Sequence, residues 1–187
     1  MRDRLLRGAL GVFTVKGYSS ASVREIVEKC WVTKPTLYYY FGSKERLYRT
    51  LIAETFAEFN RRISEIAASS LSPVKKLEAV ADHHLSHGRR YPERVTLIMM
   101  ALYRCDAFAP EIDMRVHIRP NLQTIAGIIG EGMRAGLFRK AAPLQLCLQM
   151  MGMIHTQLLI LLKPEKRLPA SSPRQIVRTF VEGIGKR

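Results

Sequence analysis

The stretch TKPTLYYYFGSKERL, residues 33–47, is the most informative part of this 187-residue sequence. Thr33 is a residue type that caps helices, and Pro35 fits a first helical turn because its missing N–H would be unpaired there. Leu37 and Phe41 are four residues apart, so their side chains share one face of a helix. The stretch therefore predicts a short, capped helix with one apolar face.

A longer helix is predicted to follow without a linker. Gly42 can end the short helix, and Ser43 can cap the next one. Residues at helical spacing then run down one face, namely Leu47, Leu51, Thr55, Phe59 and Ile63. The pattern extends to Ala68, which gives a helix about 38 Å long at ~1.5 Å per residue.

Two shorter helices are predicted upstream. The first ends at Gly17, and its apolar face consists of Leu6, Ala9, Leu10 and Phe13. The second begins with a capping box over residues 22–25, and its apolar face consists of Val23, Ile26, Val27 and Cys30. Two short helices joined by a tight turn, with hydroxyl and basic residues opening the second, are typical of a helix-turn-helix.

The charge distribution favours the same region. The chain has 30 Lys and Arg against 16 Asp and Glu, a formal net charge of +14. Residues 1–50 hold 10 basic against 4 acidic residues, so the excess is densest around the predicted motif. A protein this basic usually meets nucleic acid or an anionic membrane, although some basic proteins bind neither. The motif favours nucleic acid, because phosphate contacts need cationic side chains.

The rest of the chain is predicted to be helical as well. Ser72 and Ser172 stand as caps directly before prolines, and Gln175 completes a capping box with Ser172. Further helices are expected at about residues 73–90, 92–105, 110–136, 143–162 and from 173 onward. Because no alternating strand pattern occurs, we predict an all-α chain of about nine helices.

The cysteines and the apolar segments argue against a metal-bound, disulfide-rich, secreted or membrane-spanning protein. Cys30, Cys105 and Cys147 form no CxxC pair, so neither a zinc ribbon nor a disulfide framework is predicted. The start of the chain has no secretory apolar region, and a cytoplasmic protein is expected. Glutamines and a histidine interrupt the most apolar stretch, 144–162, so a membrane span is not expected.

These motifs together resemble the tetracycline-repressor (TetR) family of transcriptional regulators. The resemblance rests on residues 33–47, with Gly17-Tyr18 and residues 22–26 upstream, and it covers about residues 5–50. It implies a helix-turn-helix DNA-binding domain at 1–50, with the motif at about 22–41. It also implies a domain at 51–187 that binds a small ligand and dimerises through its last two helices. Such a protein binds a palindromic double-stranded DNA operator as a homodimer, and a small apolar effector releases it.

The resemblance implies which side chains meet DNA. Carried over by position, they are Arg24, Thr33, Lys34, Pro35, Thr36, Tyr38, Tyr39 and Lys44. Lys44 opens the long helix, whose N-terminus also favours a phosphate, whereas a solvated helix face would equally explain Arg24. Three consecutive tyrosines cannot share one face, because neighbours on a helix are ~100° apart. At least one must be exposed, and core packing is expected for Tyr40.

The turn before the recognition helix departs from the family pattern. The family usually has Ala-Gly-Val there, and this chain has Cys30, Trp31 and Val32. The turn glycine commonly has a left-handed backbone, which costs a residue with a side chain ~1–2 kcal/mol. We expect the capped helices to preserve the turn, so that Trp31 is strained or partly exposed close to the DNA surface.

An effector pocket is expected among the helices after residue 73. Its candidate lining combines adaptable methionines with a few polar groups, namely His84, Met99, Met100, Tyr103, Leu122, Met151, His155 and Leu158. Plain core packing would also explain these methionines, and arginines flanking Pro92 leave an acidic effector open. Dimerisation is expected through the helix at 144–162, which is apolar nearly all round, and through the face formed by Ile176, Val177, Phe180 and Ile184.

Two rival classes fit the sequence less well. His83 and His87 are one helical turn apart, as a metal pair would be, but no HExxH pattern occurs and Asp82 is the only acidic neighbour. The absence of GxSxG and GxGxxG motifs also argues against an enzyme, so no catalytic residue, metal or cofactor is predicted. The other alternative is a membrane-surface or ligand-carrier protein, although the basic residues are not confined to one helix face.

Overall fold

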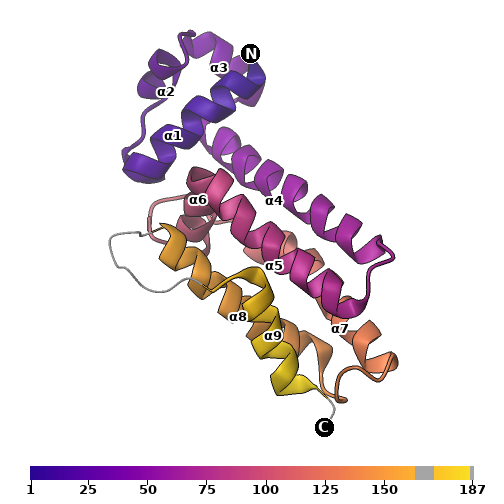
Figure 1. The fold of residues 1–187 in the computed structure, drawn as a ribbon. Helices are drawn as coiled ribbons and strands as arrows, with labels where there is room; N and C mark the ends of the chain where they lie inside the picture. The colour runs from indigo at the N-terminus through magenta and orange to yellow at the C-terminus, as the bar shows by residue number, and fades with distance from the viewer. Residues whose placement is uncertain (163–170, 186–187) are drawn as a thin grey trace. The chain divides into compact units, whose positions relative to one another are not determined.

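The computed structural model describes residues 1–162 and 171–185, which form an all-α protein (Figure 1). These residues contain nine α-helices, as predicted: α1 (Arg2–Ser20), α2 (Val23–Lys29), α3 (Lys34–Phe41), α4 (Lys44–Ala68), α5 (Pro73–Arg90), α6 (Pro92–Leu102), α7 (Met114–Arg134), α8 (Pro143–Leu162) and α9 (Pro173–Ile184). The described parts contain no named strand, and one isolated antiparallel bridge joins Phe138 to Gly185.

Most of the predicted caps are present. The Ser22 side chain accepts from the Glu25 N–H while the Glu25 carboxylate accepts from the Ser22 N–H, and Ser172 and Gln175 repeat this arrangement. The Ser43 hydroxyl accepts from the Arg46 N–H at 3.0 Å. Thr33 is different, because its hydroxyl lies 2.9 Å from that of Thr36 and makes no cap bond. Thr33 therefore occupies the N-cap position of α3, as predicted, without a hydrogen bond from its side chain to the helix backbone.

Three helix boundaries also differ from prediction. Gly17 breaks the helical geometry with φ 78° and ψ 173°, but helical turns resume and α1 reaches Ser20. The helix expected at 92–105 ends at Leu102, and the one expected from Pro110 begins at Met114. The Asp106 carboxylate accepts at 2.7 Å from the Ser19 N–H and at 3.0 Å from the Ser19 hydroxyl, so this non-helical segment secures the end of α1.

The chain forms two compact units. Unit 1 contains residues Met1–Ala57 and Glu93–Arg115, and its core includes Leu5, Phe13, Ile26, Leu37, Leu47 and Leu97, all at most 1% exposed. Unit 2 contains Glu58–Pro92 and Val116–Arg187, and α5, α8 and α9 pack against one another in it (Figure 1). Helix α4 contributes residues to both units. The functional boundary at residues 50/51 stays a prediction.

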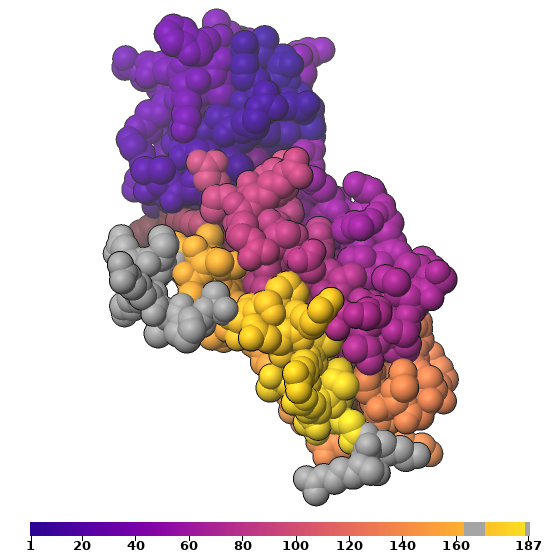
Figure 2. Space-filling view, viewed as in Figure 1, coloured from indigo at the N-terminus to yellow at the C-terminus, as the bar shows by residue number. Residues whose placement is uncertain are grey.

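Helices α8 and α9 bury their apolar faces differently from expectation. Figure 2 shows α9, in yellow, at the surface of unit 2. Its apolar face, Ile176, Val177, Phe180 and Ile184, is nonetheless buried within the single chain. The expectation that a second copy of the chain covers this face is wrong, because α5 and α8 of the same chain already cover it.

Helix α8 is apolar on its outer side as well. Leu144, Leu148 and Leu159 are about half exposed, opposite the buried face that contains Cys147, Met150 and Ile154. Among the described residues α8 is also the one helix long and apolar enough to cross a membrane. This is weak evidence for a span, because core helices pass the same test, and the absence of a membrane span stays a prediction.

Candidate nucleic-acid interface

Helices α2 and α3 form the helix-turn-helix of unit 1. Leu37 and Phe41 of α3 are buried with Ile26 of α2 in the unit 1 core, so the apolar face predicted for α3 anchors it. This leaves Tyr38 and Tyr39 exposed, Tyr39 to 85%. Tyr40 is exposed too, at 40%, so the expectation of core packing for Tyr40 is wrong. Its ring meets the Tyr39 ring edge-on, with centroids 5.2 Å apart.

The N-terminus of α3 is open to solvent. Thr33, Lys34 and Pro35 are exposed and Thr36 is half-buried. The first N–H groups of a helix have no intrahelical partner, and the positive end of the helix dipole adds to the Lys34 charge. This end of α3 can therefore offer several donors and a cation to a phosphate or a base edge.

Two other predicted DNA contacts have partners within the protein. The Lys44 ammonium donates to the carbonyls of Tyr18 and Ala21 at 3.0 and 2.8 Å, and it lies 4.2 Å from the centre of the Tyr18 ring. Lys44 therefore ties the start of α4 to the end of α1. Arg24 pairs with Glu28 at 2.7 Å on the surface, and such exposed pairs open at little cost. A DNA contact by either residue stays a prediction.

A hollow beside the exposed tyrosines adds cationic residues that sequence reasoning missed. It encloses about 540 Å³ and is lined by Arg2, Tyr38, Tyr39, Tyr40, Phe41, Gly42, Arg46, Arg49 and Thr50. The Arg2 guanidinium lies 5.7 Å from the centre of the Phe41 ring, and Arg49 pairs with Glu45 at 2.8 Å. Arg46 and Arg49 share a face of α4 through their spacing, which is the signal that could have found them. The hollow combines aromatic rings with guanidinium groups, as surfaces that bind nucleic acid do.

The predicted effector lining is divided between the two units. Met99, Met100 and Tyr103 belong to unit 1, whereas the other five residues belong to unit 2. In unit 2, Met151 and Leu158 are buried in the core, and Leu122 and His155 are half-buried. Met151, Leu158 and Leu122 belong to one hydrophobic cluster, and His155 lies close enough to His84 to affect its pKa. The lining stays a prediction.

His84 is buried in unit 2. Its pKa is lowered to about 3, chiefly by burial and in smaller part by the nearby His155. Its Nδ1 lies 2.8 Å from the Val80 carbonyl oxygen. Burial lowers the pKa of His155 as well. Both imidazoles are therefore neutral near pH 7, so this part of unit 2 suits an uncharged ligand group.

The histidine cluster predicted as a possible metal pair is an aromatic cluster in the structure. The rings of His83, His84 and His87 surround Phe59, with centroids 4.4, 4.7 and 5.2 Å from the Phe59 centroid. Within the described residues no group of three or more His, Cys, Asp or Glu side chains is arranged to hold a metal ion. Packing on Phe59 accounts for the spacing of these histidines.

Comparisons with known proteins agree with the helix-turn-helix. The model of the family described as bacterial regulatory proteins, tetR family, matches residues 5–51. The transcriptional repressor NicS of Pseudomonas putida is 26% identical over 148 residues, which cover 74% of this chain and 66% of NicS. The uncharacterised regulator YdgC of Bacillus subtilis is 40% identical over 70 residues, or 34% of its own length. The chain thus matches less than two thirds of either relative.

A solved structure extends the similarity to the whole fold. A Clostridium perfringens protein described as a regulator of fatty acid metabolism superposes with a TM-score of 0.83 at 22% identity, covering 98% of this chain and all of the other. The fold and the helix-turn-helix define a helical, DNA-binding class of protein. Within that class, the family match over residues 5–51, the curated relatives and the solved structures together support a transcriptional regulator of the TetR family.

Proposed function

We propose that this protein is a transcriptional repressor that binds a near-palindromic operator as a homodimer and leaves it when a small effector binds. The observation that carries the proposal is the exposed N-terminus of α3, with Lys34 and Tyr39 in solvent and Leu37 anchored in the core. A rigidly held helix end with free donors is what major-groove recognition requires. For such a repressor we expect a cytoplasmic location, where the DNA is, and no catalytic role.

The outer face of α8 supports the homodimer. Leu144 and Leu148 are exposed one turn apart, and Leu159 is exposed further along the same stripe of α8. Gly152 lies between them on this stripe, and a Cβ placed there would have open space around it. The exposure of these leucine side chains to water is unfavourable. An isologous contact with the same residues of a second copy would bury them. In such a dimer the two α3 helices would enter successive major grooves, roughly 34–36 Å apart.

An apolar, acyl-bearing effector is the ligand class that we infer. Unit 2 offers buried Met151 and Leu158 with neutral His84 and His155, a mainly apolar environment with few polar groups. A structural neighbour, AibR, is described in complex with isovaleryl coenzyme A and operator DNA; its TM-score is 0.73 at 20% identity, over 98% of this chain and 97% of AibR. Because α4 contributes to both units as one helix, a ligand that displaces α4 would also move the helix-turn-helix.

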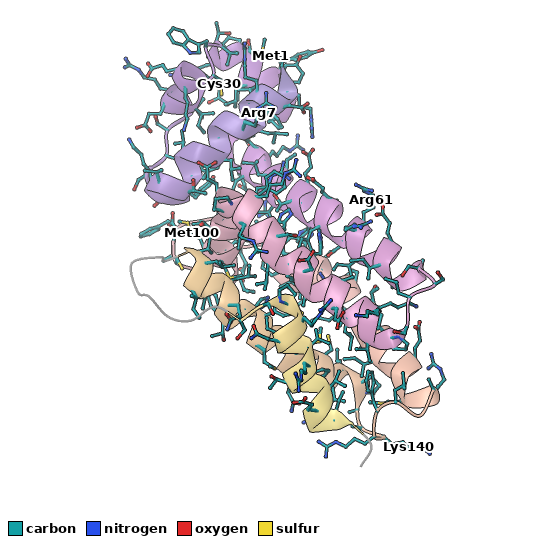
Figure 3. All side chains as sticks on the ribbon, viewed as in Figure 1. Met1, Arg7, Cys30, Arg61, Met100 and Lys140 are labelled. Carbon is teal, nitrogen blue, oxygen red and sulfur yellow. The ribbon has the colours of Figure 1, made fainter. Side chains whose placement is uncertain are left out.

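Selection of duplexes from random or native genomic DNA tests the DNA-binding proposal. We expect one near-palindromic sequence to be enriched and its affinity to fall steeply with salt. Lys34→Ala should weaken binding and lower the slope of log K against log salt by about 1, as the loss of one phosphate contact does. Lys140→Ala is the matched control, because Lys140 is an exposed lysine in the connection between α7 and α8 (Figure 3).

Three results would contradict the proposal. They are the absence of any enriched duplex, binding that is indifferent to salt, and equal effects of the two lysine substitutions. Binding to anionic vesicles without binding to duplex DNA would instead favour a membrane-surface protein.

A further inference from the structure

Trp31 has an unusual position in the turn between α2 and α3. It directly follows Cys30, the C-cap residue of α2, which Figure 3 labels. Helix α3 begins three residues after Trp31. Its backbone is left-handed, with φ 50°, and its side chain is 90% exposed. Trp31 is therefore both strained and almost completely solvated, as the sequence led us to expect.

The protein holds this turn through its backbone and not through the indole. The Trp31 N–H donates to the Glu28 carbonyl at 3.1 Å, and the next N–H, of Val32, donates to Val27 at 3.0 Å. The Arg4 guanidinium donates to the Trp31 carbonyl at 3.4 Å. The indole adds no burial to the fold, and glycine would suit the left-handed backbone better. Folding therefore gives no reason for a tryptophan at this position.

The surroundings of Trp31 are those of a DNA strand contact. Thr33 and Lys34 are exposed two and three residues after it, Lys29 is exposed two residues before it, and the Arg4 guanidinium donates to its carbonyl. In a helix-turn-helix the first residues of the recognition helix reach the base edges, so residues shortly before them lie near the strand that borders the groove. An indole combines an apolar face with one N–H donor, and a DNA strand offers deoxyribose faces and phosphate oxygens.

We propose that Trp31 packs its ring against deoxyribose on the DNA strand that borders the major groove and donates its Nε1–H to a phosphate of that strand. This inference rests on the proposed DNA-binding function. The contact adds affinity without reading sequence, because sugar and phosphate are the same at every step. It also braces the turn that sets the angle of α3.

The emission of Trp31 provides a direct test, because the chain has a single tryptophan. The probe is the tightest-binding duplex recovered by the selection described above. We expect the duplex to change Trp31 emission over the same concentrations at which the anisotropy of a labelled duplex shows binding. Trp31→Gly should weaken the binding of this duplex about tenfold, and of unrelated duplexes by a similar factor.

Glycine is the informative substitution, because it fits the left-handed backbone and so keeps the turn. A thermal melt of Trp31→Gly at or above that of the wild type would show that lost binding is not lost folding. Phe108→Ala is the matched control, since Phe108 is an aromatic residue of unit 1 that is 84% exposed. Its duplex affinity should equal that of the wild type.

The outcomes separate this inference from the proposed function. A wild-type protein that binds no duplex rejects the proposed function and the inference together. A wild-type protein that binds duplex with unchanged Trp31 emission, and with equal affinity after Trp31→Gly, overturns the Trp31 contact alone. A loss confined to the selected duplex would also overturn it, because that loss would indicate base readout.

Discussion

His84 shows at the scale of one residue how burial sets a charge state. Its side chain is buried among Phe59, Val80 and His155, and its pKa falls to about 3 because the protein interior disfavours the imidazolium. The unfolded chain would bind a proton at this residue near pH 6.5. Between these two values the unfolded state carries more protons, so stability must decrease as the pH falls.

His84→Leu should therefore make the stability of the protein less dependent on pH. On going from about pH 7 to about pH 5, the wild type should lose about 2 kcal/mol of unfolding free energy through His84 alone. Over the same pH change, the loss of unfolding free energy in His84→Leu should be smaller than the loss in the wild type by about that amount. Some dependence should remain, because burial also lowers the pKa of His83 and His155. Urea unfolding of both proteins at the two pH values measures the difference, and parallel losses would show that His84 protonates freely in the folded state.

Helix α8 is the element whose two faces have different surroundings. One face packs in the unit 2 core with Cys147, Met150 and Ile154, and the other presents Leu144 and Leu148 to solvent. Burial of apolar area contributes ~25 cal/mol per Å², so a leucine stripe repeated in a partner can supply much of a dimer contact. This element is where self-association is expected.

Leu148→Arg should convert the dimer to monomers, because it would place two desolvated cations against each other across an isologous contact. Operator affinity should fall with it, since a monomer covers one half-site only. Leu71→Arg is the control: Leu71 is an exposed leucine between α4 and α5 and should leave the dimer intact. Sedimentation of the three proteins decides the question, and a monomeric wild type would exclude this role of α8.

The proposed switch belongs to the scale of the whole molecule. An effector that favours the DNA-free state by ~1–3 kcal/mol weakens DNA binding about 5–150-fold, and DNA must weaken effector binding by the same factor. Titration of acyl-coenzyme A compounds with and without the operator tests this reciprocity. Equal effector affinity in both titrations would rule out the linkage.

His155→Trp should block the release of DNA by an effector while leaving operator affinity unchanged. His155 is half-buried in unit 2, where an indole would fill space that the proposed effector would occupy, and it lies outside the helix-turn-helix. A thermal melt close to that of the wild type would confirm that the variant is folded. Retained release by the same effector would place the ligand elsewhere.

The sequence predicted the helices and the class of DNA-binding motif because these depend on local rules. The capping boxes at Ser22 and Ser172, the buried pair Leu37 and Phe41, and the left-handed turn at Trp31 are all confirmed. The capping boxes and the buried pair depend on side chains within one or two helical turns, so spacing alone reveals them, whereas the turn at Trp31 was inferred from the resemblance to the family.

Only the tertiary structure determined which side chains are buried, which are exposed, and which bond to residues distant in sequence. The apolar face of α9 is buried in its own chain, Tyr40 is exposed, and Lys44 is bonded to the end of α1. Residues 93–115 belong to the same compact unit as the helix-turn-helix, which no local pattern indicates. These outcomes depend on which residues, distant in sequence, lie opposite. Periodicity shows which face of a helix is apolar, but packing alone determines what covers that face.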